Sequence, residues 1–141
     1  MGWGRSVIQP EARSVTLILS PWNYPINLSL TPLIGALAAG DTAILKSSKK
    51  APTTVRALSE LSASTFPPSP VSMVESGPDM AEALLELPFN HIFFTGSLAI
   101  GRKVLSAATQ TPTSTTLKRG GKSPALVGES ADLKLAAKRI V

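Results

Sequence analysis

The 141-residue sequence contains no cysteine and only one histidine, His91. The absence of cysteine excludes a disulfide framework, a thiolate metal site and a thiol nucleophile within this chain. A single histidine cannot build a zinc site, so no metal is expected. A lone histidine at the start of an apolar strand is predicted to be a satisfied core residue rather than a functional one.

Aromatic residues are also few, at 5% of the sequence. Nucleic-acid binding favours a continuous basic face interleaved with aromatic side chains, whereas here a net charge of +5 is spread over small groups of Lys and Arg. A nucleic-acid partner is therefore not expected. The phosphates of a dinucleotide are better candidate anions, and solvated surface charge is the alternative for any one lysine.

Long apolar runs are missing as well. The longest, residues 26–40, contains Pro32 and is too short to cross a bilayer. Arg5, Glu11 and Arg13 interrupt the opening stretch, which is unlike the apolar centre of a secretory signal. We therefore expect a cytoplasmic protein without a membrane span.

Apolar runs alternate with turn residues along the rest of the chain. Strands are expected at residues 14–20, 42–46, 71–75, 91–94 and 124–127. Helices are expected before Gly40, from Pro52 to the proline-rich break at 67–70, at 80–87, at 98–108 and from Leu133 onward. The first two helices should turn their apolar residues inward: Leu28, Leu30, Leu33, Ile34, Leu37, Val55, Leu58 and Leu61.

This alternation predicts an α/β fold. Strands and helices of this length form a Rossmann-like, doubly wound, mostly parallel sheet with helices on both faces. The sheet is expected to be incomplete at the C-terminus, because the last helix has no end within the chain. We expect an N-terminal segment at residues 1–13 and a single domain at residues 14–141.

Two short strings fall at the carboxyl ends of expected strands, where ligand sites of α/β proteins form. Gly96 and Ser97 stand where a strand turns into a helix, so their backbone could hold a pyrophosphate, although Ser97 could equally be a helix cap. Asn23, within Pro21-Trp22-Asn23-Tyr24-Pro25, could donate a hydrogen bond to an oxyanion or could cap the next helix.

The strings together resemble the aldehyde dehydrogenase superfamily. They are Pro21-Trp22-Asn23-Tyr24-Pro25, Ile44-Leu45-Lys46, Phe94-Thr95-Gly96-Ser97 and Gly120-Gly121-Lys122-Ser123-Pro124, in this order. The chain is similar to the cofactor-binding half of this family, especially its class 3-like, fatty-aldehyde branch, from about Val15 onward. The resemblance implies a domain for NAD or NADP, a cysteine that attacks the aldehyde, and a glutamate that activates water.

The resemblance also implies roles for individual residues. Asn23 matches the oxyanion-hole amide, and Trp22 matches an aromatic residue beside the cofactor. Lys46 matches the lysine that contacts the adenosine ribose, and Gly96 with Ser97 matches the phosphate-side turn. These residues would form the cofactor cradle and part of an oxyanion hole.

Two positions depart from the family pattern by reversing charge. Lys118 stands where the family has its general-base glutamate, and a protonated ammonium cannot accept a proton from water. Lys49 stands where the family has a glutamate that binds the adenosine ribose. A lysine there favours the 2′-phosphate of NADP over the hydroxyl of NAD, by charge complementarity.

The sequence therefore predicts a truncated protein similar to aldehyde dehydrogenases and inactive by itself. Its nucleophilic cysteine would lie beyond Val141, together with the substrate domain and the oligomerisation hairpin. Alternatives are a non-catalytic module that binds NADP, a module that pairs with a full-length relative, and the product of a gene fragment without a stable fold.

Overall fold

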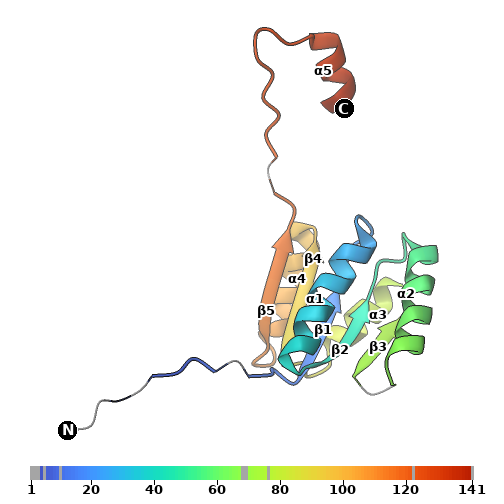
Figure 1. The fold of residues 1–141 in the computed structure, drawn as a ribbon, viewed down its shortest axis with the longest axis vertical. Helices are drawn as coiled ribbons and strands as arrows, with labels where there is room; N and C mark the ends of the chain where they lie inside the picture. The colour runs from blue at the N-terminus through green and yellow to red at the C-terminus, as the bar shows by residue number, and fades with distance from the viewer. Residues whose placement is uncertain are drawn as a thin grey trace.

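The computed structural model describes residues 4, 6–9, 11–67, 70–75, 77–121 and 123–140. Its strands form one five-stranded sheet in the order β3-β2-β1-β4-β5, and every neighbouring pair is parallel (Figure 1). The strands are β1 (Val15–Leu19), β2 (Thr42–Lys46), β3 (Val71–Val74), β4 (His91–Gly96) and β5 (Ser114–Arg119). The helices are α1 (Pro25–Ala39), α2 (Pro52–Thr65), α3 (Pro78–Leu85), α4 (Leu98–Ala108) and α5 (Leu133–Ile140).

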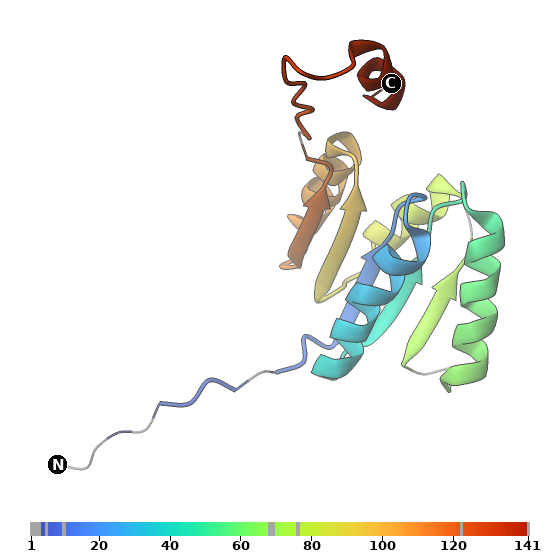
Figure 2. The same ribbon diagram turned by 45° about the horizontal axis from the view of Figure 1, so that its top comes forward.

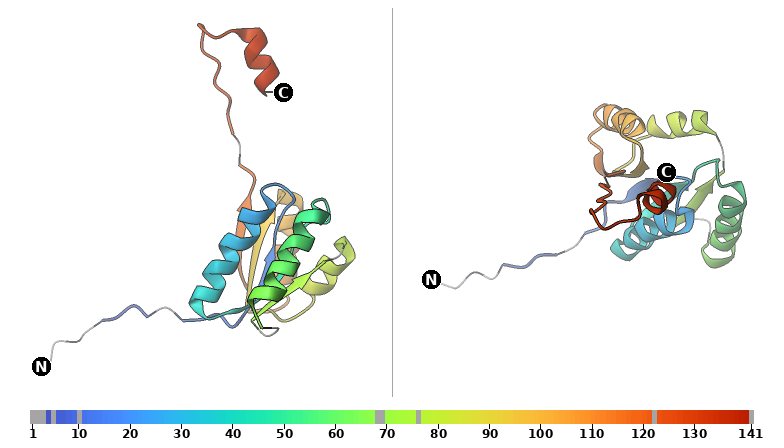
Figure 3. Two further views of the ribbon diagram at one scale, coloured as in Figure 1. Left: turned by 45° about the vertical axis from the view of Figure 1, so that its right-hand side comes forward. Right: turned by 90° about the horizontal axis from the view of Figure 1, so that it is seen from above.

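Helices cover both faces of the sheet, as the view from above shows (Figure 3, right). On one face, Leu33 of α1 packs with Ile18 and Leu45 of the sheet. On the other face, side chains of α3 and α4 pack against Leu17 and Phe94. The predicted Rossmann-like α/β class is confirmed, with a described sheet that is entirely parallel.

The order of the strands creates a switch point between β1 and β4. From β1 the chain moves outward to β2 and β3, then returns to the other side of β1 with β4 and β5 (Figure 2). The loops that leave β1 and β4 therefore run to opposite faces of the sheet. A crevice forms between such loops, beyond the carboxyl ends of the strands.

The inward face of α1 differs in part from the expected one. Leu30, Leu33 and Leu37 join the core, whereas Ile34 is 65% exposed. Leu61 of α2 was also expected inward and is 53% exposed. A helix packed on one face of a sheet buries only the stripe that faces the strands, so the expectation for Ile34 and Leu61 was wrong.

A buried hydroxyl cluster joins α1 to the sheet. Ser20, Ser29 and Ser47 lie within mutual hydrogen-bond reach, with Oγ–Oγ distances of 2.8, 3.0 and 3.2 Å. Ser29 is fully buried, at 0% exposure. Because each hydroxyl can donate and accept, the three side chains satisfy one another and fix the first turns of α1 against the ends of β1 and β2.

The fifth strand lies at a different place from the expected one. Residues 124–127 are irregular, and β5 is formed instead by Ser114–Arg119. This stretch is rich in Ser and Thr, and the sequence pattern does not predict a strand there. β-Branched threonine suits a strand, and an edge strand needs only a short apolar side, which Leu117 supplies.

At the amino-terminal ends of β1 and β2, Asp41 binds the segment that enters β1. Its carboxylate accepts hydrogen bonds from the backbone N–H of Arg13, at 2.5 Å, and from the hydroxyl of Thr16, at 2.8 Å. Beside them, His91 Nδ1 lies 2.7 Å from Ser114 Oγ, which also accepts a bond from the Arg13 guanidinium. His91 is half-buried and hydrogen-bonded, in agreement with a structural role.

Helix α5 lies apart from the sheet in Figure 1 and in the left view of Figure 3. It was expected from Leu133 onward and is present to Ile140, while Val141 lies outside the described residues. Leu133 and Ile140 are 71% and 55% exposed. Within the described part of the chain, no helix has both the length and the apolar character needed to cross a membrane.

Acidification is expected to destabilise the fold through His91. Burial and the nearby Arg13 guanidinium lower the pKa of His91 below its ordinary value of 6.5. The unfolded chain therefore binds a proton that the folded chain resists, so stability falls as the pH drops through about 6.5. Thermal unfolding between pH 7.5 and 5.5 should show a falling Tm. His91→Asn, which removes the only histidine, should flatten the profile; an equal fall in both proteins would contradict the assignment.

Candidate functional site

An open groove of about 1040 Å³ lies at the carboxyl edge of the sheet, beside the switch point between β1 and β4. Helix α1 packs mainly on β1 and β2 and leaves this end of β4 and β5 uncovered. The groove is lined by Pro21, Trp22, Asn23, Tyr24, Asn27, Leu28, Thr31, Pro32, Lys50, Phe93, Thr95, Gly96, Ser97, Leu98, Ile100, Lys118, Arg119 and Gly120. The fold thus forms this hollow where α/β proteins bind ligands.

The loop after β1 forms one wall of the groove. Tyr24 is the N-cap residue of α1 and has a left-handed backbone, with φ 47° and ψ 49°, while Pro25 begins the helix. Asn23 lines the groove, and no side-chain cap bond is found at this helix start, so the capping alternative for Asn23 is wrong. Trp22 also lines the groove and is 59% exposed, so its indole ring is accessible to a ligand.

The turn from β4 into α4 forms the floor. Ser97 caps α4, because its Oγ accepts a hydrogen bond from the Ile100 N–H at 3.4 Å. Gly96 has a packing reason of its own: a Cβ there would lie 2.6 Å from the Phe94 ring. Thr95 is buried, and its Oγ1 has no hydrogen-bond partner among the described residues. The floor of the groove therefore contains the capped N-terminus of α4 and the Thr95 hydroxyl, which has no hydrogen-bond partner among the described residues.

Cationic side chains reach the groove from two sides. Lys118 and Arg119 come from the end of β5, and Lys50 comes from the loop after β2. In the parallel register Lys118 stands beside Thr95. None of the described lining residues is Asp or Glu, so the groove favours an anion. Lys122 lies outside the described residues.

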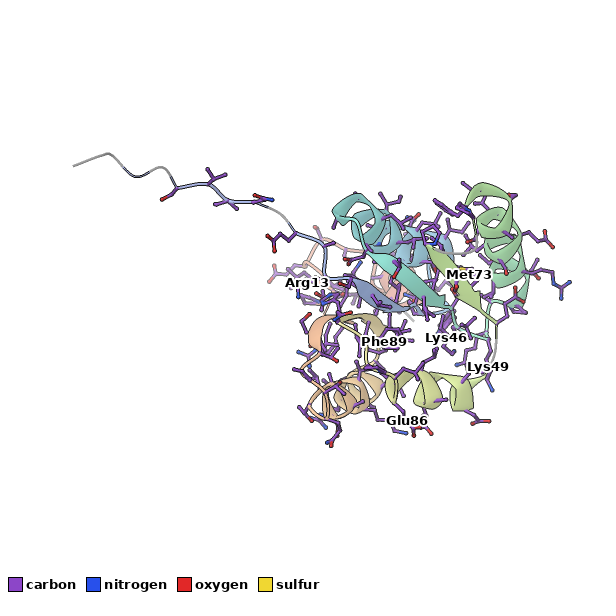
Figure 4. The ribbon with its side chains drawn as sticks, turned by 90° about the horizontal axis from the view of Figure 1, so that it is seen from below. Arg13, Lys46, Lys49, Met73, Glu86 and Phe89 are labelled. Atoms are coloured by element: carbon purple, nitrogen blue, oxygen red, sulfur yellow. The ribbon has the colours of Figure 1, made fainter. Side chains whose placement is uncertain are left out.

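Lys46 and Lys49 occupy a separate place. Lys46 ends β2 and is only 8% exposed, and its Nζ donates to the Ser47 carbonyl at 3.4 Å. Burial, together with the charge of Lys49, lowers the pKa of Lys46 below its ordinary value. Figure 4 shows the two lysines close together. Lys49 lines a second hollow of about 230 Å³ with Arg56 and Glu75, among other residues.

The structure therefore divides the residues predicted from sequence into two sets. Trp22, Asn23, Gly96, Ser97 and Lys118 meet in the groove, whereas Lys46 and Lys49 lie together at the end of β2. Both sets are at the carboxyl edge of one sheet.

Sequence reasoning did not single out three groove residues as site residues: Tyr24, Lys50 and Arg119. The grouping of Lys49 with Lys50, and of Lys118 with Arg119, was the available signal for the two cations. No sequence pattern predicted the left-handed backbone conformation of Tyr24.

Fold and groove together define a Rossmann-like α/β protein with an anion-favouring site at its switch point. The model of the aldehyde dehydrogenase family matches residues 4–141, and the chain belongs to this family. The match begins at residue 4, whereas the resemblance was expected to start at about Val15.

Individual relatives agree with this assignment. The chain is 42% identical to 4,4'-diaponeurosporen-aldehyde dehydrogenase of Staphylococcus aureus, over 96% of this chain and 30% of the relative. It is also 42% identical to aldehyde dehydrogenase family 3 member H1 of Arabidopsis thaliana, over 95% and 28%. The structure of a Mycobacterium tuberculosis aldehyde dehydrogenase complexed with NAD+ superimposes with a TM-score of 0.76 and 36% identity, over 88% and 26%. The chain thus spans under a third of these relatives' length.

Proposed function

We propose that this chain binds NAD or NADP at the carboxyl edge of its sheet and does not oxidise aldehydes by itself. The observation that carries the proposal is the buried Lys46, whose ammonium has three donors and a single hydrogen-bond acceptor among the described residues, the Ser47 carbonyl. A buried cation without an acidic partner is costly, and ribose or phosphate oxygens would offset that cost.

The arrangement of the two sets fits an extended dinucleotide. Lys46 and Lys49 would hold the adenosine ribose, and the start of α4 at Ser97 would face the pyrophosphate, because helix N-termini favour anions. Trp22 would lie against the cofactor in the groove. The complex of the Mycobacterium tuberculosis relative with NAD+ supports a dinucleotide as the ligand.

Two features support the absence of oxidation by this chain alone. A bound nicotinamide would supply a hydride acceptor, but the chain has no cysteine to form a thiohemiacetal. Lys118 lies at the groove in the position that the family resemblance gives to the general base. Asn23 would keep only the amide of the oxyanion hole.

Lys49 is expected to set the preference between the two dinucleotides. The 2′-phosphate of NADP would lie near its ammonium, whereas NAD has only a hydroxyl there. Isothermal titration should show tighter binding of NADP. Lys49→Glu should weaken NADP binding roughly fivefold, about 1 kcal/mol for one partly screened charge pair, with little loss of NAD. Lys138→Glu on α5 makes the same charge change elsewhere; tighter NAD binding by the parent chain would overturn the preference.

Catalysis is the second property to measure. Purified chain mixed with a long-chain aldehyde and NADP or NAD should produce no reduced cofactor above the rate without protein. A rise in Tm on adding the dinucleotide would confirm that the protein is folded and loaded in the same assay. A sustained, protein-dependent rise in the absorbance of the reduced nicotinamide would refute the proposal that this chain does not oxidise aldehydes by itself.

A second candidate function is association with a longer member of the family. Leu133 and Ile140 of α5 favour it, because they are seven residues apart on one face of the helix and both exposed, and an exposed apolar helix face is usually covered. Sedimentation of an equimolar mixture with a longer relative should give a complex that Ile140→Lys weakens. The exposed Leu126→Lys is the matched control; independent sedimentation of the two unmodified proteins would exclude this candidate.

A further inference from the structure

We propose that the exposed face of α3 is a docking surface for a basic amphipathic helix, and that α5 of the same chain is the helix that occupies it. Docking places the cations of α5 beside the carboxylates of α3 and covers apolar side chains of both helices. The contact uses neither the groove nor the hollow beside Lys49, so it is independent of dinucleotide binding. It competes with association with a longer relative, because both contacts use Leu133 and Ile140.

Helix α3 carries its negative charges on its exposed side. Asp79, Glu82 and the C-cap residue Glu86 are exposed and follow one another at intervals of three and four residues, so they lie along one side of the helix. Figure 4 shows Glu86 at the outer surface of α3, away from the sheet. Within the described chain, Glu82 pairs with Lys103 of α4 at 3.0 Å, and no ion pair is found for Asp79 or Glu86. Two of the three carboxylates therefore remain available to further cations.

An exposed apolar stripe runs beside these carboxylates. Met80, Ala83 and Leu87 are three and four residues apart and share one side of the helix. Leu87 continues the last turn, because its N–H donates to the Leu84 carbonyl at 3.2 Å. Met80 and Leu87 are 40% and 49% exposed, whereas Leu84 points into the core. An outward apolar stripe flanked by carboxylates is the surface that a basic amphipathic helix fits.

Helix α5 has the complementary pattern. Leu133 and Ile140 share one face, and Lys134 and Lys138, four residues apart, share a neighbouring face. Arg139 adds a third cation, and α5 contains no Asp or Glu. Charge complementarity selects partners and fixes their register. Three cations on α5 thus match three carboxylates on α3, and each helix brings an exposed apolar stripe to the contact.

The segment between β5 and α5 is long enough for this contact. Figure 1 shows α5 beyond the carboxyl edge of the sheet, so the docked helix is a second position of α5. Thirteen residues, 120–132, separate β5 from α5 and can span up to about 43 Å. Helix α4 packs on β5 and α3 packs on α4, so α3 lies two packing distances, about 20 Å, from β5. A tether of this kind gives an effective concentration on the order of 1 mM, which favours α5 of the same chain over a second molecule at micromolar concentration.

Pulsed electron paramagnetic resonance tests the contact, because the chain has no cysteine and two introduced cysteines are labelled uniquely. Spin labels are placed at Gln110→Cys, after the end of α4, and at Leu135→Cys, on the side of α5 away from Leu133 and Ile140. We expect one narrow population of short distances that persists when labelled protein is diluted with excess unlabelled protein. A broad distribution of long distances would overturn the proposal. Loss of the short distance on dilution would show docking on a second copy and overturn the assignment to the same chain.

Charge variants of the doubly labelled chain separate this contact from general charge effects. Lys138→Glu and Glu86→Lys should each lower the ratio of docked to free α5 about threefold, because each turns attraction into repulsion. Lys138→Arg should retain the ratio. Arg56→Glu and Glu60→Lys make the same charge changes at exposed positions of α2, on the other face of the sheet, and should leave it unaltered. An unchanged ratio in both docking variants, or an equal fall in the α2 controls, would contradict the proposal.

Salt tests the part played by charge. In about 1 M NaCl the Debye length falls to about 3 Å, so the ratio of docked to free α5 should drop about twofold or more. An unchanged ratio would contradict docking by charge complementarity. All distances are recorded without dinucleotide, so failure of NADP to bind would reject the proposed function alone, and a missing short distance would reject the docking proposal alone.

Discussion

The parallel pairing of β1 with both β2 and β4 is the constraint on which the fold and the groove depend. Leu17 and Ile18, adjacent on β1, are both fully buried and enter the two separate cores on opposite faces of the sheet. A central strand buried on both faces must have helices on both sides. Because β1 and β4 are neighbours, the loops that follow them run to opposite faces of the sheet, and the groove lies between these loops.

Positively charged side chains distinguish the carboxyl edge of this Rossmann-like sheet. The family match covers the sheet, the turn at Ser97 and the loop with Trp22. Lys49 and Lys118 then place ammonium groups at both ends of the carboxyl edge, with Lys46 buried between strand and loop. Anion binding is consistent with every one of these positions, whereas removal of a proton from water is not. These positions are therefore consistent with binding of a dinucleotide without oxidation of an aldehyde.

Much of the fold could be predicted from local pattern. The apolar runs of β1, β2 and β4 and the proline or glycine boundaries of α1 and α2 are visible in the sequence, because a fully buried strand needs an unbroken apolar run. The wrong prediction of the last strand shows the limit of local sequence patterns. Ser114–Arg119 becomes a strand only because β4 offers it an edge, and residues 124–127, although apolar, have no partner.

The sequence by itself determined the family, the α/β class, the absence of a thiol and the positive charges at Lys49 and Lys118, since residue identities are properties of the chain. Only the tertiary structure decided that Lys118 stands beside Thr95, that the Thr95 hydroxyl has no hydrogen-bond partner among the described residues, and that Lys49 faces a hollow apart from the groove. Register and burial arise from pairing between segments far apart in the chain, so no local pattern encodes them.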